Sequence, residues 1–240
     1  MNAEQILYED NDLIVCYKPA GMAVQTARVG QRDMVSEIAA YLAQSVRNSG
    51  SPYVGIIHRL DQPVEGILVF AKNPKAAGKL SRQMAENKTE KYYYAVISAY
   101  RLPGWSKQPE STIKGTLADY LCKDGKTNTS TIVSKEQKDA KRAKLFYEIC
   151  DWAAEEEIAL AKIKLVTGRH HQIRVQMSHA GMSLLGDYKY ADEETKKLSE
   201  RLGQKQVALC AYEISFLHPA TGKQMRFHQK PQGQIFQKFL

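Results

Sequence analysis

The chain has 240 residues, of which 43% are hydrophobic and 25% charged, so it can bury a full core and is not expected to be disordered. A formal net charge of +8 and a pI near 9.2 favour a polyanionic partner such as nucleic acid. The four cysteines form no CxxC pair, the N-terminus does not resemble an export signal, and no apolar run approaches the roughly 18 residues that span a membrane. We therefore expect a soluble, cytoplasmic protein without a membrane partner.

The first third of the chain predicts strands and two capped helices. Short strands are expected on both sides of an Asn-Asp turn within residues 6–18, ended by Pro19 and Gly21. Apolar residues recur at helical spacing from the cap Asp33 to about Asn48. Two β-type runs, "YVGIIH" and "GILVFAK", then enclose the loop "HRLDQPVEG". A second helix begins at Asn73 and Pro74, and its expected buried face comprises Ala77, Leu80 and Met84.

The rest of the chain is richer in strands. Strands are expected in "KYYYAVISAY", near Ile113 and Ile132, in "AKLFYEIC" and in "IALAKIKLV". Helices follow in "RHHQIRVQMSHAG", with Ile173, Met177 and Ala180 on one side, and over residues 192–203, before a hairpin across the Pro219–Gly222 turn. The lysine-rich stretch 123–144 is the best candidate for a flexible excursion. This pattern is typical of an α+β fold with a mixed, mainly antiparallel sheet and flanking helices.

Four separated motifs define a family resemblance. "HRLDQPVEGILVFAKN", "KYYYAV", "LVTGRHHQIRVQMSHAGMSLLGDYKYA" and "LCAYEISFLHP" occur in the order and approximate spacing of the RluA-type pseudouridine synthases, which the chain resembles over essentially its whole length. The resemblance implies one catalytic domain over residues 1–240, with two lobes around an RNA-binding cleft. The N-terminal S4-type RNA-binding domain that many members carry is not expected here.

The resemblance also implies the reaction, which isomerises specific uridines in ribosomal or transfer RNA to pseudouridine. The bond from the base nitrogen to the sugar carbon breaks, the uracil turns, and the bond reforms to carbon, without a cofactor. Asp61 matches the family's catalytic aspartate. Its carboxylate could attack the sugar carbon or remove a proton from the neighbouring sugar carbon, and the sequence leaves both routes open.

Four other residues match family positions around that aspartate. Burial alone would favour a protonated carboxylate, and Arg169, at the start of a predicted helix, matches the arginine that pairs with the aspartate. Tyr93 matches the tyrosine that stacks on the uracil and assists proton removal. Arg59 matches the arginine that enters the duplex where the target nucleotide has swung out, and Ile173 would line the base pocket.

Each of these residues also has a simpler reading. Asp61 could cap a turn, Arg59 could pair locally with it, Arg169 could bond within its own helix, and Tyr93 could be one inward tyrosine of a strand. The order of the four motifs favours the catalytic reading. One departure stands out: Val64 and Glu65 occupy the places of the family's Thr-Ser, and an acidic side chain near phosphate would repel RNA unless it turned outward or met a lysine. Restoring Thr-Ser would then raise or redirect activity.

Two further classes of function stay open. The chain could be a non-catalytic RNA-binding protein on the same scaffold, or a metal-dependent hydrolase that uses its histidines, although no HExxH pattern is present and no metal is expected. The histidines in question are His58, His170, His171 and His179. A monomer is the simpler expectation. We expect RNA to be bound by lysines around the cleft, namely Lys72, Lys75, Lys79 and Lys88.

Overall fold

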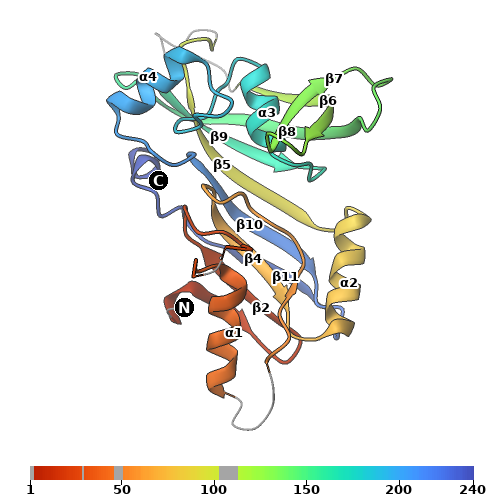
Figure 1. The fold of residues 1–240 in the computed structure, drawn as a ribbon. Helices are drawn as coiled ribbons and strands as arrows, with labels where there is room; N and C mark the ends of the chain where they lie inside the picture. Colours follow the sequence, from red (N-terminus) through yellow and green to blue (C-terminus); the bar gives the residue numbers. More distant parts are fainter. Residues whose placement is uncertain (1–2, 29, 46–50, 103–112) are drawn as a thin grey trace. The chain divides into compact units, whose positions relative to one another are not determined.

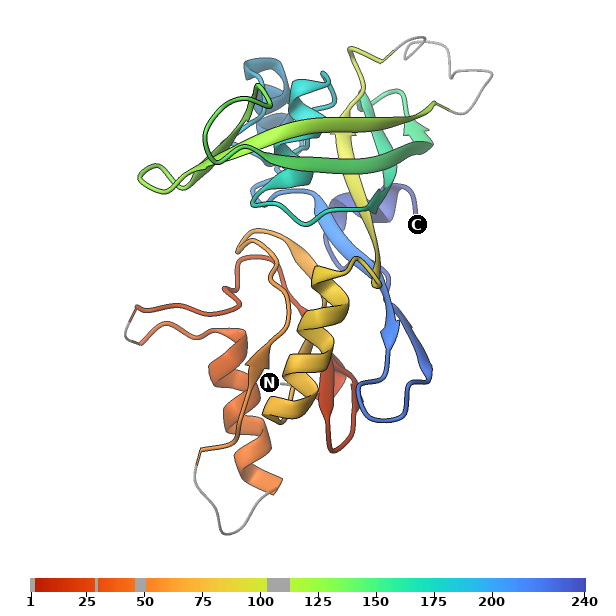
Figure 2. The same ribbon diagram turned by 90° about the vertical axis from the view of Figure 1, so that its right-hand side faces the viewer.

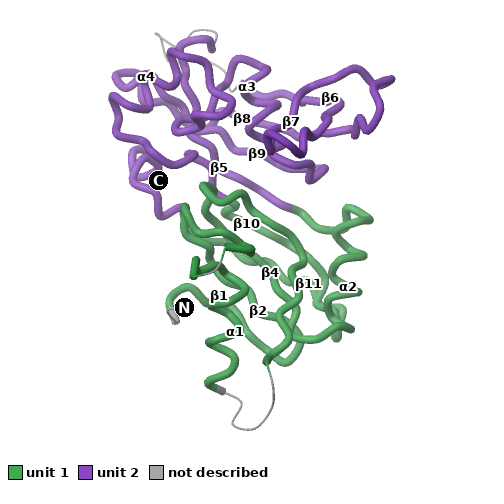
Figure 3. The backbone as a smooth tube through the Cα atoms, in the orientation of Figure 1, with its two compact units in different colours: residues 1–90, 211–230 green, residues 91–210, 231–240 purple. Residues whose placement is uncertain are grey.

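The fold is α+β in the computed structural model, which describes residues 3–28, 30–45, 51–102 and 113–240 (Figure 1). The chain divides into two compact units, which Figure 3 distinguishes by colour: unit 1 comprises Met1–Glu90 and Ala211–Lys230, and unit 2 comprises Lys91–Cys210 and Pro231–Leu240. Antiparallel pairing predominates, which agrees with the predicted mainly antiparallel sheet. The prediction of one catalytic domain stays a prediction, and the units are described one at a time.

Unit 1 is built around two fully buried strands. β2 (Leu13–Lys18) and β4 (Glu65–Ala71) pair in register from Leu13 opposite Ala71 to Lys18 opposite Gly66. The strand order is β1, β2, β4, β10, with β3 on β4 and β11 on β10. The remaining bounds are β1 (Ile6–Glu9), β3 (Gly55–Ile56), β10 (Leu209–Leu217), β11 (Gln224–His228) and the short 3-10 helix η1 (Ala3–Gln5). The predicted strand "YVGIIH" thus forms only the two residues of β3.

The two helices of unit 1 begin at the predicted caps. Asp33 caps α1 (Met34–Ser45), because its Oδ1 accepts a hydrogen bond from the Ser36 N–H at 2.7 Å. Asn73 caps α2 (Pro74–Ala85), and its side chain accepts from the Ala76 N–H at 2.8 Å. The buried face of α2 contains Ala76 and Leu80, whereas the predicted Ala77 and Met84 are only half-buried. The predicted end of the first helix, residues 46–48, lies outside the described residues.

Unit 2 is a sheet with helices on one face. The strand order is β5, β9, β8, β6, β7. Leu209 and Cys210, the first two residues of β10, also belong to this unit. α3 packs against the sheet through Val175, which clusters with Leu121 and Ala143. The bounds are β5 (Glu90–Ser98), β6 (Lys114–Asp124), β7 (Thr129–Val133), β8 (Lys141–Ala153), β9 (Ile158–Leu165), α3 (Gln172–His179), α4 (Glu193–Arg201) and η3 (Gln234–Lys238).

Two expectations for unit 2 are wrong. Residues 123–144 are not a flexible excursion, because they form the end of β6, all of β7 and the start of β8. The β-branched run "TSTIV" pairs with β6 and outweighs the signal from the surrounding lysines. In α3, Ile173 and Met177 are buried as predicted, but Ala180 is exposed beyond the helix end.

Two further observations concern membrane-spanning helices and disulfide bonds. None of the helices in the described part of the chain is long and apolar enough to cross a membrane. No disulfide joins the four cysteines, all of which are described; Cys16 and Cys210 are buried.

Candidate active site

Asp61 lies on a short loop of unit 1 that joins β3 to β4. We call residues 58–64 the aspartate loop. The Val64 N–H donates to the Asp61 carbonyl at 3.0 Å, which closes a turn at Pro63, and Asp61 itself is half-buried. Because β4 follows directly and is buried along its whole length, the end of the loop is anchored to the core of the unit.

A buried lysine fastens the aspartate loop to the end of β2. Lys18 is fully buried, and its Nζ donates to three backbone carbonyl oxygens: those of Pro19 at 3.0 Å, Met22 at 2.8 Å and Gln62 at 3.1 Å. The Gln62 carbonyl also accepts from the Gly21 N–H at 2.8 Å, and the Gln62 side chain donates back to the Gly21 carbonyl at 3.0 Å. These bonds fix the backbone immediately after the aspartate. They satisfy all three hydrogens of the ammonium group.

The charges around Lys18 oppose the cost of burying it. Burial lowers the pKa of Lys18 to about 8, and the carboxylates of Asp61 and Glu65 act in the opposite direction. Asp61 therefore faces a cation within its own unit. Sequence reasoning missed this lysine, since "CYKPAG" was read only as a strand end; a lysine that closes an otherwise apolar strand was the available signal.

Glu65 does not reach toward a phosphate, because it is buried at the start of β4 and is only 5% exposed. The Tyr17 hydroxyl donates to Glu65 Oε2 at 2.5 Å, and Lys18 supplies the neighbouring positive charge. Glu65 therefore does not turn outward, and it lies close enough to Lys18 for their charges to interact. Gly66, the second residue of β4, has φ +132°, and a Cβ there would lie 2.5 Å from the Ala211 backbone, so this position of the strand requires glycine.

The burial of Glu65 changes the expected effect of replacing it. Glu65→Ser should lower the free energy of unfolding by about 1–3 kcal/mol, because the buried Tyr17 hydroxyl and Lys18 lose their acceptor and their counter-charge. Glu65→Gln, which keeps an acceptor, should cost less. Urea unfolding measures both. A double-mutant cycle with Tyr17→Phe should give a coupling energy of about 0.5 kcal/mol or more, and additive effects would contradict the pair.

The other two polar residues at the start of the aspartate loop have different surroundings. Arg59 is exposed, and its guanidinium donates to Gln25 Oε1 at 3.3 Å. His58 Nε2 accepts from the Val69 N–H at 3.2 Å, so this nitrogen carries no proton and cannot also bind a metal. An exposed arginine on a loop is compatible with a role at RNA.

Tyr93, Arg169 and Ile173 belong to unit 2. Tyr93 lies in β5 opposite Ile163 of β9 and is 6% exposed, whereas its neighbours Tyr92 and Tyr94 point to the other face of the sheet. Ile173 lies in the first turn of α3 and is 4% exposed. Since Asp61 and Arg59 belong to unit 1, the expected pair between Asp61 and Arg169 stays a prediction.

Arg169 precedes α3 rather than starting it. The helix begins at Gln172, after His171 in the left-handed conformation, and the Arg169 Nε donates to the Arg142 carbonyl at 2.9 Å. Gln172 is 3% exposed, and its Oε1 accepts from the Thr167 hydroxyl at 2.8 Å and the Arg169 N–H at 3.0 Å. This buried glutamine therefore fixes the "TGR" loop. Sequence reasoning missed it, since Gln172 lies about a quarter turn away from the predicted apolar side of Ile173 and Met177.

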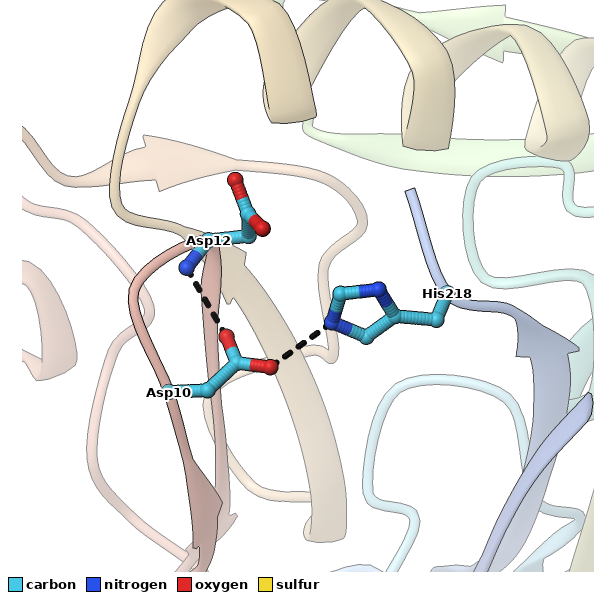
Figure 4. Close-up of side chains that lie close together, drawn as sticks. All are labelled: Asp10, Asp12 and His218. Atoms are coloured by element: carbon cyan, nitrogen blue, oxygen red, sulfur yellow. Dashed lines mark hydrogen bonds and ion pairs between the residues drawn. The ribbon is translucent and has the colours of Figure 1, made fainter. Parts of the chain in front are cut away.

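A group of potential metal ligands in unit 1 is occupied by internal hydrogen bonds (Figure 4). His218 Nδ1 accepts from the N–H groups of Ala220 and Thr221, both at 3.2 Å, so the proton lies on Nε2 and is donated to Asp10 Oδ2 at 2.7 Å. Asp10 Oδ1 accepts from the Asp12 N–H at 2.8 Å. This arrangement joins the β1–β2 turn to the turn after β10.

The four histidines of the metal hypothesis are not part of that group. His170 Nδ1 lies 2.9 Å from Ser130 Oγ, and His171 Nδ1 lies 2.6 Å from the Tyr190 hydroxyl. These contacts orient the two stacked rings just before α3. They account for both histidines as supports of the "TGR" loop.

Comparison with known proteins identifies the family. The family model described as RNA pseudouridylate synthase matches residues 12–179, from β2 through α3. "tRNA pseudouridine synthase C" of Haemophilus ducreyi is 30% identical, with 90% of this chain and 86% of that protein covered. "Ribosomal large subunit pseudouridine synthase D" of Zymomonas mobilis is also 30% identical, with 93% and 68% covered. The solved structure "Human RNA Pseudouridylate Synthase Domain Containing 4" shares the fold, with a TM-score of 0.71, 21% identity, and 95% and 89% coverage.

These matches define an isomerase class that acts on RNA. The chain belongs to the RNA pseudouridylate synthase family. Its function is RNA pseudouridine synthesis, as the four motifs predict, rather than metal-dependent hydrolysis.

Proposed function

We propose that the protein converts a uridine of transfer or ribosomal RNA to pseudouridine, with Asp61 as the catalytic carboxylate. The names of the two relatives above, one acting on tRNA and one on the large ribosomal subunit, support these two RNA classes. The observation that carries the proposal is the fixed aspartate loop, whose backbone is held by the buried Lys18 next to Asp61 within the matched region.

The remaining residues take the roles of their family positions. Tyr93 stacks on the uracil and assists removal of the proton from the carbon that forms the new bond, while Ile173 lines the base pocket. Arg59 occupies the space left by the extruded nucleotide, for which its exposed position is suitable. The glycosidic bond to nitrogen breaks, the bond to carbon forms, and the proton lost by that carbon is balanced by one gained at the released nitrogen.

Mapping of modified uridines tests the substrate. Carbodiimide mapping of tRNA and rRNA from strains with and without the gene should reveal one or a few uridines that lose the modification. The wild-type protein should restore it in isolated RNA, and Asp61→Asn should not. If no position in either RNA class changes, the proposed substrate is wrong; if RNA is bound but never modified, the protein is the non-catalytic alternative.

Arg169 is proposed to pair with the Asp61 carboxylate. Arg169→Gln should lower kcat by about 10²-fold and move the acidic limb of the rate profile to higher pH, because the carboxylate loses a stabilising cation. Arg169→Lys should recover part of the rate, since it keeps the charge without the planar fork. The kcat against pH measures both effects. A fall in rate with an unmoved acidic limb would contradict the pairing and favour a structural role.

The proposal includes a monomeric enzyme in the cytoplasm. The absence of a disulfide among the four cysteines supports a reducing compartment. Sedimentation of the purified protein tests the oligomeric state.

A further inference from the structure

One face of the unit 2 sheet carries polar and aromatic side chains on four adjacent strands. One row across these strands consists of Tyr92, Lys164, Phe146 and Thr116, each directly opposite the next. The neighbouring row consists of Lys162, Glu148 and Lys114. Side chains directly opposite one another share a face of the sheet. Tyr93, Ile163 and Leu145 alternate with these residues and are buried on the other face, which α3 covers. Figure 2 views this unit with β6 and β8 in front of α3.

This face contains a hollow of about 330 Å³. Its lining includes three lysines, Lys114, Lys162 and Lys164, against a single carboxylate, Glu148. Glu148 lies between Lys114 and Lys162 in the register, so its single negative charge is next to two of the three positive charges and can balance only one of them. The hollow is therefore positively charged and complementary to an anion.

Aromatic rings lie among these cations. The Tyr92 ring has the Nζ of Lys164 at 5.3 Å and that of Lys162 at 5.9 Å from its centroid. Phe146 is 39% exposed, and Lys144 Nζ lies 4.6 Å from its centroid. Cations beside exposed rings are the combination that binds single-stranded nucleic acid, because bases stack on the rings while phosphates contact the cations.

We infer that this hollow, lined by Tyr92, Lys114, Phe146, Lys162 and Lys164, is a second RNA-contact surface that binds a single-stranded segment of the substrate RNA. Its phosphates contact the three lysines and one of its bases stacks on Phe146. The surface differs from the catalytic site, because Tyr93 points to the opposite face of the sheet. The inference rests on the proposed function only in that the bound RNA is the substrate.

The charge part is tested with Lys114→Gln, Lys162→Gln and Lys164→Gln combined. The matched control combines Lys126→Gln, Lys135→Gln and Lys138→Gln, which change the charge equally in exposed turns of the same unit. The probe is a fluorescein-labelled single-stranded oligouridine titrated at several NaCl concentrations. The slope of log affinity against log salt should fall by about 2 in the hollow variant, because about 0.7 is lost per phosphate contact to a single strand. The control should retain the wild-type slope.

The stacking part is tested with Phe146→Ala, with Tyr188→Ala as the exposed aromatic control in the same unit. Phe146→Ala should weaken oligouridine binding about fivefold or more at high salt and leave binding of an RNA duplex of equal length unchanged. A slope change equal in both lysine variants, or no loss with Phe146→Ala, would overturn the inference.

A second readout separates this inference from the catalytic proposal. With tRNA or rRNA from the strain lacking the gene, the lysine variant should raise KM about tenfold or more and keep the kcat of the wild type within about twofold. A wild-type protein that binds RNA but forms no pseudouridine would contradict the catalytic proposal alone. A lysine variant with reduced kcat and unchanged KM would contradict the second surface alone.

Discussion

Asp61→Asn is expected to lower the rate of pseudouridine formation by about 10⁴-fold or more while leaving the protein folded. The amide has nearly the same shape but can neither attack the sugar carbon nor accept a proton from its neighbour, so both open routes lose their agent. The aspartate loop should keep its conformation, because Lys18 holds it through the Gln62 carbonyl rather than through the aspartate side chain alone. Single-turnover conversion of the mapped uridine measures the rate.

The matched control for this variant is Asp139→Asn. Asp139 lies in an exposed turn with φ +65°, a conformation that asparagine tolerates, so the same chemical change is made away from the aspartate loop. Circular dichroism and the melting temperature of both variants should match the wild type within a few degrees. Retention of more than a hundredth of the wild-type rate by Asp61→Asn would reject the carboxylate as the agent.

Lys18→Met is expected to be the most destabilising change near the site, at about 3–5 kcal/mol. Burial of the ammonium costs stability by itself, as the lowered pKa of Lys18 indicates, but its removal leaves carbonyl acceptors without donors and two carboxylates without a cation. The aspartate loop should also lose its fixed position, so that kcat falls together with stability. Urea unfolding and single-turnover kinetics check the two effects.

The matched control is Lys75→Met on the exposed first turn of α2, which should change the free energy of unfolding by less than about 0.5 kcal/mol. If Lys18→Met were as stable as this control, Lys18 would not fasten the loop.

The same lysine predicts how stability depends on pH. Its pKa falls from 10.5 in the unfolded chain to about 8 in the folded protein, so between these values the unfolded chain binds a proton that the folded protein does not. Stability from this titration is complete above the higher value and is lost as the pH falls through 8. The difference between wild type and Lys18→Met should therefore widen by about 1–3 kcal/mol from pH 7 to pH 10. A constant difference would contradict the buried, titrating lysine.

Much of the fold follows from local sequence patterns. The apolar runs of β2 and β4 and the caps Asn73 and Asp192 fix their elements with little help from the rest of the chain. The prediction failed at residues 123–144, where lysines were weighed as a solvent signal although strands β6, β7 and β8 need only one buried face. Composition along a segment does not report what covers that face.

The residues of the candidate site that lie in family motifs could be predicted from the sequence. The residues that hold those motifs in place could not, because their partners lie in other segments of the chain. Lys18 and Gln172 were missed because neither their residue type nor their position in the sequence identifies the groups that they bond. Their roles depend on the carbonyls of Gln62 and Lys144, which lie 44 and 28 residues away along the chain. The partner of Glu65 was missed for the same reason, since Tyr17 is 48 residues away.

Unit 1 combines an early segment of the chain, residues 1–90, with a late one, residues 211–230, and this determines when it can form during synthesis. β4, which follows the aspartate loop, adjoins β10, and Gly66 packs directly on Ala211, yet the roughly 120 residues of unit 2 from Lys91 to Cys210 are made between these two segments of unit 1. A nascent chain that ends before residue 211 thus exposes one edge of β4 and lacks the neighbour that closes this side of the unit. The aspartate loop is translated early, but the unit that holds it is complete only after residues 211–230 have left the ribosome.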